Sequence, residues 1–200
     1  MNTYEIRAIY NAHTLRVYQA YPPEVAIPAL KAGRFVPPFK MERMTWIKPS
    51  FTWMMYRCGF GSKAGQEVVL GIDITREGFE WALAHSALSH FVPALHTSET
   101  HWKAEVAACP VRIQWDPERD ARLNPMAGVR SLQVGLSREA VQKYVREWIV
   151  GIEDVTPIAH QMAEARAFDL ASGVWPHQQE RIYPIPEVLQ QRICPEHSGR

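Results

Sequence analysis

The sequence predicts a single α+β domain, in which a mixed and mainly antiparallel sheet is flanked by helices. The apolar share of 46% in a chain of 200 residues is enough for a sizeable core. Several β-prone runs follow one another directly instead of alternating with helices, which argues against a doubly wound parallel sheet. No GxGxxG, GxxxxGK[ST] or GxSxG motif occurs, so Rossmann, P-loop and α/β-hydrolase folds lose their main support.

The first third of the chain predicts a hairpin followed by two short helices. The runs YEIRAIY and TLRVYQAY are rich in β-formers and flank Asn11, as in a hairpin. Pro23 and Gly33 mark the start and stop of the first helix. The second helix is expected from Pro49 to Cys58, and the apolar run QEVVLGIDI predicts a strand after it.

In the rest of the chain, Thr75 is expected to cap a helix over REGFEWALAHSAL. The segment ALHTSETHW predicts a loop, and VRIQW and RSLQVGL predict two strands joined by the polar connection DPERDARLNPMAG. Residues 172–200, rich in proline, predict an extended C-terminal tail of the single domain 1–200. Ser137 is expected to cap one further helix, whose apolar stripe is Val141, Tyr144, Val145, Trp148 and Ile152.

Charge and cysteine usage restrict the class of protein. The net charge of +1 argues against a general nucleic-acid coat, so any anion recognition must be local. The N-terminus lacks the pattern of a signal peptide, and no apolar stretch approaches 18 residues, so we expect no membrane span. Cys58, Cys109 and Cys194 are widely spaced, which is typical of reduced thiols, and we expect a cytoplasmic protein.

The histidines do not predict a metal site. His85, His90, His96 and His101 are spaced 5, 6 and 5 residues apart. Two ligands on one helix face need a spacing of four residues, so we expect no bound metal.

The strongest candidate for a binding site is the stretch KMERMTWIKPSFTWMMYR. Lys40, Arg43 and Lys48 precede Ser50 at the start of the second helix. A helix N-terminus exposes unpaired N–H groups that favour an anion, and Ser50 can cap it or contact a ligand. Trp46 and Trp53 offer flat surfaces for a base. This pattern predicts a pocket for a phosphate-bearing nucleotide at 40–57; the alternative is a solvated charged loop beside core aromatics.

Other polar residues lie in predicted strands. Arg7 and Arg16 face each other across the expected hairpin, and Gln19 ends its second strand. Arg112 and Gln114 share a face of the fourth predicted strand, and Arg130 with Gln133 begins the fifth. Asp73, at the end of an apolar strand, could orient one of these arginines. A structural ion pair is the alternative for each arginine. The acidic candidates for acid–base chemistry are Glu180, Glu187 and the pair Asp116 and Glu118.

The runs RVYQAY, ALKAGRFVPPFKMERMTWIKPSFTWMMYR, VLGIDITREGFEWAL and VRIQWDPERD resemble an uncharacterised, mainly bacterial family, domain of unknown function 4291. The likeness covers nearly the whole chain.

Part of the chain also resembles ADP-ribosyltransferase-type folds. LRVYQAYPPEVAIPALKAGRF is similar to the first motif of those enzymes, and MTWIKPSFTWMMYRCGF with QEVVLGIDI to their next segment. The resemblance implies a split sheet, NAD as the ligand, and nucleotidyl or ADP-ribosyl transfer. Gln19 then stands in place of the first-motif histidine, Trp46 or Tyr56 is the stacking aromatic, and Glu180 is the late catalytic acid. Chemistry on an RNA end is a further reading of the same fold.

Two functions of other classes remain open. ALKAGRF…FKMERM is similar to small β-barrel modules that accompany pseudouridine synthases, although the spacing from Gly33 to Lys40, Glu42 and Arg43 departs from that signature. This reading implies an RNA-binding or RNA-processing protein. The other alternative is a non-catalytic oligomeric adaptor, with the aromatic segment as its interface.

Overall fold

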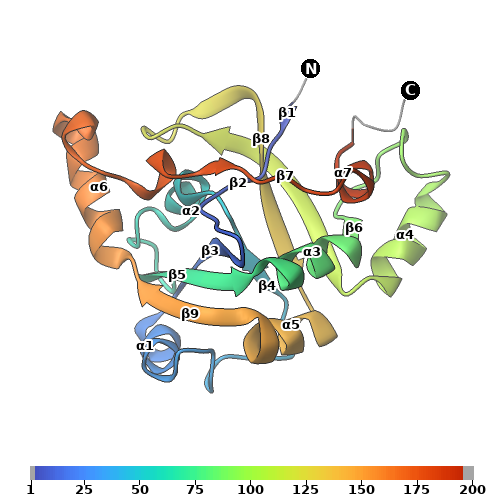
Figure 1. Cartoon of the computed structure of the whole chain (residues 1–200), viewed down its shortest axis with the longest axis horizontal. Coiled ribbons are helices and arrows are strands. Elements are labelled where there is room, and N and C mark those ends of the chain that lie inside the picture. The colour runs from blue at the N-terminus through green and yellow to red at the C-terminus, as the bar shows by residue number, and fades with distance from the viewer. Residues whose placement is uncertain (1–2, 196–200) are drawn as a thin grey trace.

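The two main sheets of the protein meet at an angle, and helices cover their outer faces. The computed structural model describes residues 3–195 (Figure 1). The strands are β1 (Thr3–Tyr4), β2 (Arg7–Ala8), β3 (Thr14–Tyr21), β4 (Thr45–Ile47), β5 (Val68–Thr75), β6 (Ser86–Leu88), β7 (Val111–Arg119), β8 (Pro125–Leu136), β9 (Ile149–Asp154) and β10 (Arg181–Ile182). The helices are α1 (Pro23–Ala32), α2 (Phe51–Cys58), α3 (Arg76–Ala84), α4 (Glu99–Ala108), α5 (Glu139–Lys143), α6 (Thr156–Phe168) and α7 (Glu187–Ile193).

The larger sheet has the order β1-β8-β7-β6, and β4 also pairs with β8. β7 and β8 form a long antiparallel pair in which Gln114 lies opposite Gln133. β4 runs antiparallel to the C-terminal end of β8, and this pairing places Trp46 opposite Gly135. The sheet is mixed, because β1 and β6 pair with their neighbours in parallel.

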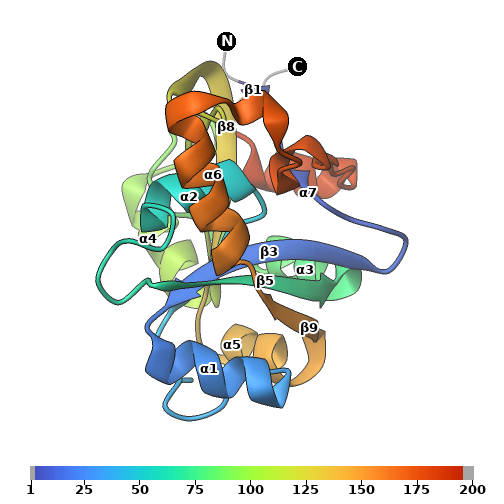
Figure 2. The same cartoon turned by 90° about the vertical axis from the view of Figure 1, so that its left-hand side faces the viewer.

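The smaller sheet is antiparallel, with the order β3-β5-β9 (Figure 2). α1 and α5 lie together on one side of it in this view. The two sheets are joined where Tyr18 of β3 bridges to Lys48, just after β4. The Tyr18 N–H donates to the Lys48 carbonyl at 2.8 Å, and the Lys48 N–H donates back at 3.3 Å.

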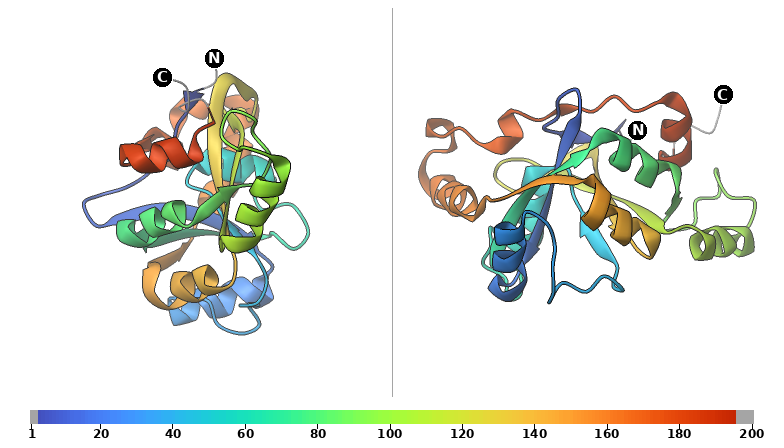
Figure 3. Two further views of the ribbon diagram at one scale, coloured as in Figure 1. Left: turned by 90° about the vertical axis from the view of Figure 1, so that its right-hand side faces the viewer. Right: turned by 60° about the horizontal axis from the view of Figure 1, so that its bottom comes forward.

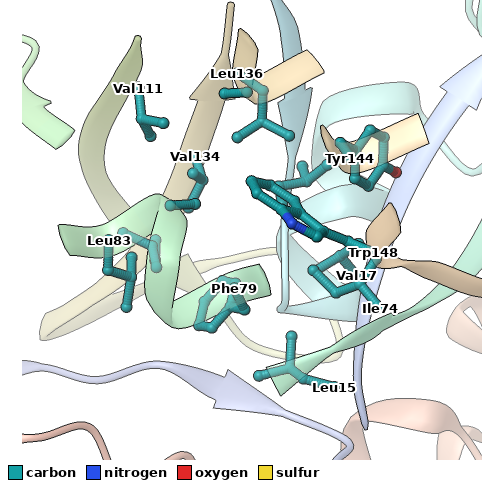
Figure 4. Packing of buried hydrophobic residues seen from close by; sticks show 14 of the residues in the cluster. Leu15, Val17, Ile74, Phe79, Leu83, Val111, Val134, Leu136, Tyr144 and Trp148 are labelled. Carbon is teal, nitrogen blue, oxygen red and sulfur yellow. The ribbon is translucent and has the colours of Figure 1, made fainter. Parts of the chain in front are cut away.

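The main core fills the space between the two sheets and α3 (Figure 4). Gly78 of α3 lies against the indole of Trp148, and a Cβ at this position would overlap the ring. This close approach requires glycine at position 78, in the first turn of α3. The labelled core side chains are Leu15, Val17, Ile74, Phe79, Leu83, Val111, Val134, Leu136, Tyr144 and Trp148.

The expected α+β class is confirmed, and so are the elements with strong local signals. Gly33 ends α1 in the left-handed region, with φ of 67°. Ser50 caps α2 by accepting from the Trp53 N–H at 3.2 Å, and Thr75 caps α3 by accepting from the Gly78 N–H at 3.2 Å. No helix within residues 3–195 is long and apolar enough to cross a membrane.

Three local predictions were wrong. The segment predicted as a loop contains α4, which Ser98 caps at its first turn. The Ser137 side chain donates to the Pro110 carbonyl instead of capping a helix. The helix that follows ends in a π-helical turn at Tyr144–Trp148, and Ile149–Asp154 forms β9. Pairing with β5 therefore overrides the helical period of this segment.

The N-terminal hairpin is only partly formed. Tyr10 and Leu15 make an antiparallel bridge, but Arg7 in β2 pairs with Ile182 of β10. The C-terminal segment crosses the molecule after α6 (Figure 3). Within the predicted tail it forms a 3-10 turn at Pro176–Gln178, the strand β10 and the helix α7, and residues 196–200 lie outside the described part.

Candidate functional site

A cleft lies where the two sheets meet. Its inner pocket, of about 420 Å³, is bounded by β3, β4, α2 and the β7–β8 pair. Its outer pocket, of about 560 Å³, is bounded by the end of β3, the start of α1 and the loop before β4. Both pockets share six lining residues, so they form one continuous cleft: Ala20, Tyr21, Met44, Thr45, Arg57 and Gln66.

The cleft is rich in positive charge. Lys48 lines the inner pocket, Lys40 and Arg43 line the outer pocket, and Arg57 lines both. Among residues 3–195, no carboxylate lines either pocket. In the described part of the chain, none of these four cations takes part in an ion pair. Their charges are therefore available to an anion in the cleft.

Lys48 is the buried member of this group, with 6% of its surface exposed. Its ammonium group donates to the Trp46 carbonyl at 3.1 Å. Burial, and then the nearby charge of Arg57, lower the pKa of Lys48 to about 8. Asp116 acts in the opposite direction but is too weak to reverse the shift. A buried ammonium group without a carboxylate partner is unfavourable, and a bound anion would offset that cost.

Gln19 holds the strands beside the cleft together. It is 2% exposed, and its amide group donates to Thr45 Oγ1 at 2.6 Å and contacts the Trp46 carbonyl and Tyr21 Oη at 3.1 Å. The Tyr144 hydroxyl donates to Gln19 Oε1 at 2.8 Å. Because protein groups use both ends of this amide, Gln19 positions the wall of the pocket.

Trp46, together with Tyr21, supplies an aromatic surface in the inner pocket. Its position on β4 is opposite Gly135 of β8, and its indole lies against that glycine. A Cβ on Gly135 would come within 3.0 Å of the indole and of the Met44 sulfur. The absence of a side chain at 135 thus lets the indole pack closely against β8.

The N-terminus of α2 is not open to a ligand. The Ser50 hydroxyl donates to Glu118 at 2.9 Å, and the Phe51 N–H donates to Glu180 at 2.7 Å. Two acidic side chains of the chain itself therefore occupy the N-terminal end of this helix. This differs from the expectation that the cations and the helix amides act on one ligand: Lys48 lies in the cleft, whereas Ser50 and Glu180 do not line it.

The remaining predicted residues lie outside the cleft. Trp53 is buried and stacks on Tyr56 with ring centroids 5.1 Å apart. Arg7 pairs with Glu5 at 2.7 Å. Arg112 donates to carbonyls at the C-terminal end of α4, including that of Cys109 at 2.7 Å. Arg130 lies in β8 opposite Tyr4. Arg16 forms ion pairs with Asp73 and Glu153, which agrees with the alternative that this arginine has a structural role.

Three further polar groups line the inner pocket: Arg57, which sequence reasoning did not select, and Gln114 and Gln133, which it named as polar residues of two later strands. Arg57 follows Met54 by three residues on α2, and this spacing puts both on the cleft side. Gln114 and Gln133 meet only because β7 pairs with β8. Within residues 3–195, no group of three His, Cys, Asp or Glu residues is arranged to hold a metal ion.

The family model described as Domain of unknown function (DUF4291) matches residues 5–183. The chain belongs to the DUF4291 family. Every residue that lines the two pockets of the cleft lies within the part that matches DUF4291. No curated protein matches the chain.

Proposed function

We propose that the protein is an enzyme that acts on a nucleotide-type substrate carrying a phosphate, bound in the cleft between the two sheets. The observation that carries this proposal is the buried Lys48, which has no ion pair within the described residues and shares its pocket with Arg57. Phosphate is the biological anion that a lysine and an arginine together bind well.

The other residues of the cleft suit the rest of a nucleotide. The inner pocket has a volume typical of small-molecule sites and combines two aromatic side chains, Trp46 and Tyr21, with amide groups. The outer pocket adds an apolar surface from Val25 and Phe39 beside Lys40 and Arg43. A base can stack on the aromatic side chains while its phosphates lie between the cations.

The chemistry that we propose is transfer of the nucleotidyl or ADP-ribosyl type, with NAD as the first ligand to test. Two sheets that meet beside a cleft support the resemblance to ADP-ribosyltransferase-type folds. Glu180 lies outside this cleft, so we assign proton transfer to Lys48 instead. In the ligand-free protein the pKa of Lys48 is lowered to about 8, and a bound phosphate favours its protonated form, so the role assigned to Lys48 is that of proton donor.

RNA ends carry the same phosphate and ribose groups and are a second substrate class for this cleft. A purely structural adaptor is less well supported, because Trp53 is buried within its own chain and the cleft is open. We place the activity in the cytoplasm, since Cys58, Cys109 and Cys194 are free thiols.

The test is ligand-induced stabilisation followed by turnover. Thermal unfolding is measured with NAD, ADP-ribose, AMP, ATP, a 5′-phosphorylated RNA oligonucleotide and inorganic phosphate. A ligand at one hundred times its Kd stabilises the folded state by about 2.7 kcal/mol. We expect full stabilisation of the wild type and of Lys103→Met, whose lysine is exposed on α4, and clearly smaller stabilisation of Lys48→Met.

Turnover of each stabilising ligand is then followed by chromatography, with release of nicotinamide from NAD as the first readout. A ligand that stabilises both lysine variants equally would contradict the assignment of the cleft. Binding without any turnover would contradict the enzymatic part of the proposal.

A further inference from the structure

Asp116 orients two glutamine side chains in the inner pocket. Its carboxylate accepts a hydrogen bond from Gln114 Nε2 at 3.1 Å and another from Gln133 Nε2 at 2.5 Å. A carboxylate only accepts hydrogen bonds, so both amides must turn their nitrogen atoms toward it. The two Oε1 atoms are thereby directed away from Asp116.

These two oxygen atoms are a matched pair of acceptors. Gln114 and Gln133 are directly opposite each other in the antiparallel pair of β7 and β8, where Cβ atoms are about 5 Å apart. Both side chains line the inner pocket, although Gln133 is only 7% exposed. Within residues 3–195, neither Oε1 atom accepts a hydrogen bond from the protein. The pocket therefore presents two adjacent acceptors to whatever binds beside Lys48 and Arg57.

We infer, on the basis of the nucleotide-binding function proposed above, that Gln114 and Gln133 select ribose over deoxyribose by accepting hydrogen bonds from its two vicinal hydroxyl groups. A vicinal diol presents two donors on neighbouring carbon atoms, which suits two side-by-side acceptors. An amide edge of a base presents one donor and one acceptor. Its acceptor atom would therefore face a glutamine oxygen atom that is also an acceptor, and no hydrogen bond could form there. Asp116 is a positioning residue in this arrangement.

The experiment is calorimetric titration of the wild type with four probes: AMP, 2′-deoxy-AMP, ribose 5-phosphate and 2-deoxyribose 5-phosphate. We expect each ribose compound to bind about tenfold more tightly than its deoxy partner, since a site that loses one hydrogen bond loses about that factor. Equal affinity within each pair overturns this inference alone. Binding of none of the four overturns the proposed function, and the inference with it.

The pair that lacks a base separates sugar recognition from base recognition. Suppose that AMP binds more tightly than 2′-deoxy-AMP, whereas ribose 5-phosphate and 2-deoxyribose 5-phosphate bind equally. This result would show that the base positions the ribose, and it would contradict direct selection by the glutamines.

Matched variants locate the selectivity. Gln114→Met and Gln133→Met remove one acceptor each at nearly constant side-chain length. At the glutamine that accepts from the 2′-hydroxyl, the replacement should bring the affinity ratio of AMP to 2′-deoxy-AMP toward one, while the affinity for 2′-deoxy-AMP changes less than about twofold. At the glutamine that accepts from the 3′-hydroxyl, which both nucleotides carry, the replacement should weaken both about equally. A ratio that stays unchanged in both variants overturns the inference. Gln66→Met is the control, because Gln66 lines the same pocket but makes no bond to Asp116. A ratio that falls equally in the control overturns the assignment.

Asp116→Asn tests the positioning role. Its amide can accept only through its oxygen atom, so at least one glutamine loses its fixed orientation. We expect the ratio of AMP to 2′-deoxy-AMP to fall about threefold to tenfold, with an unchanged unfolding temperature in the absence of ligand. A loss of affinity that is equal for both nucleotides would indicate a merely structural role and contradict the assignment.

Discussion

The backbone N–H of Phe51 donates a 2.7 Å hydrogen bond to the carboxyl group of Glu180, which lies 129 residues further along the chain. The contact ties the C-terminal segment to the first turn of α2, whose last turn carries Arg57 into the cleft. Burial, followed by the charge of Glu118, raises the pKa of Glu180 to about 8, although the Phe51 N–H and Arg7 act against the shift. The side chain of Glu180 therefore links the C-terminal segment to α2, and its protonation state changes within the physiological pH range.

This pKa predicts how stability depends on pH. Between the ordinary value of 4.5 and about 8, the folded protein holds a proton that the unfolded chain has lost. The free energy of unfolding should therefore fall as pH rises through this range, and the loss is complete above pH 8. Glu180→Gln keeps an oxygen atom for the Phe51 N–H but does not titrate.

We expect the Glu180→Gln variant to be more stable than the wild type at pH 8, by about 1 kcal/mol or more, and its stability to change less between pH 5 and pH 8. Urea unfolding at both pH values measures this. Glu187→Gln, at an exposed position, is the control. Since Glu180 does not line the cleft, ligand affinity should stay the same; a large loss of affinity would restore Glu180 as a site residue.

Replacement of Lys48 by methionine should separate binding from stability. The change removes a buried charge but keeps most of the apolar side chain, so we expect the free energy of unfolding to rise by about 1 kcal/mol. Affinity for a phosphate ligand should fall at least tenfold, because a charged hydrogen bond in a buried site is lost. Chemical unfolding and calorimetry measure the two effects. If stability falls instead, Lys48 has a structural partner in the folded protein.

The affinity for phosphate ligands should also depend on pH through Lys48. In the ligand-free protein, Lys48 carries its charge only below a pKa of about 8, lowered from 10.5. Affinity should therefore be constant below that pH and fall by up to tenfold per pH unit above it. Calorimetry from pH 7 to pH 10 with AMP measures the slope. Lys48→Met should remove this dependence, and a slope that persists in the variant would point to another group.

Gly78→Ala should destabilise the protein although alanine favours helices. A Cβ at 78 overlaps the Trp148 indole, and overpacking of this kind costs about 1–3 kcal/mol. The matched control is Gly151→Ala, where the nearest atom to an added Cβ is the Asp73 Oδ2 at 3.9 Å. We expect the control to change the free energy of unfolding by less than about 0.5 kcal/mol. Equal effects at both positions would show that Trp148 can move.

Residues close together in the chain were sufficient to predict the ends of several helices. Pro23 and Gly33 bounded α1, and the side chains of Ser50 and Thr75 capped α2 and α3 as expected. Each of these features depends on contacts within a few residues of chain, which short sequence windows contain. The same windows could not place β9, because its pairing with β5 joins segments about 80 residues apart.

The sequence by itself determined the α+β class and the concentration of cations around Lys48, since composition, caps and charge runs are local properties. Only the tertiary structure decided that the start of α2 binds side chains of the same chain, and that the cleft around Lys48 stays open. Chain segments far apart in sequence brought Glu118 and Glu180 to the start of α2 and thereby closed it to ligands. The pairing of β7 with β8 put Gln114 and Gln133 beside Lys48 instead, because the register between two strands is set by packing across the whole sheet.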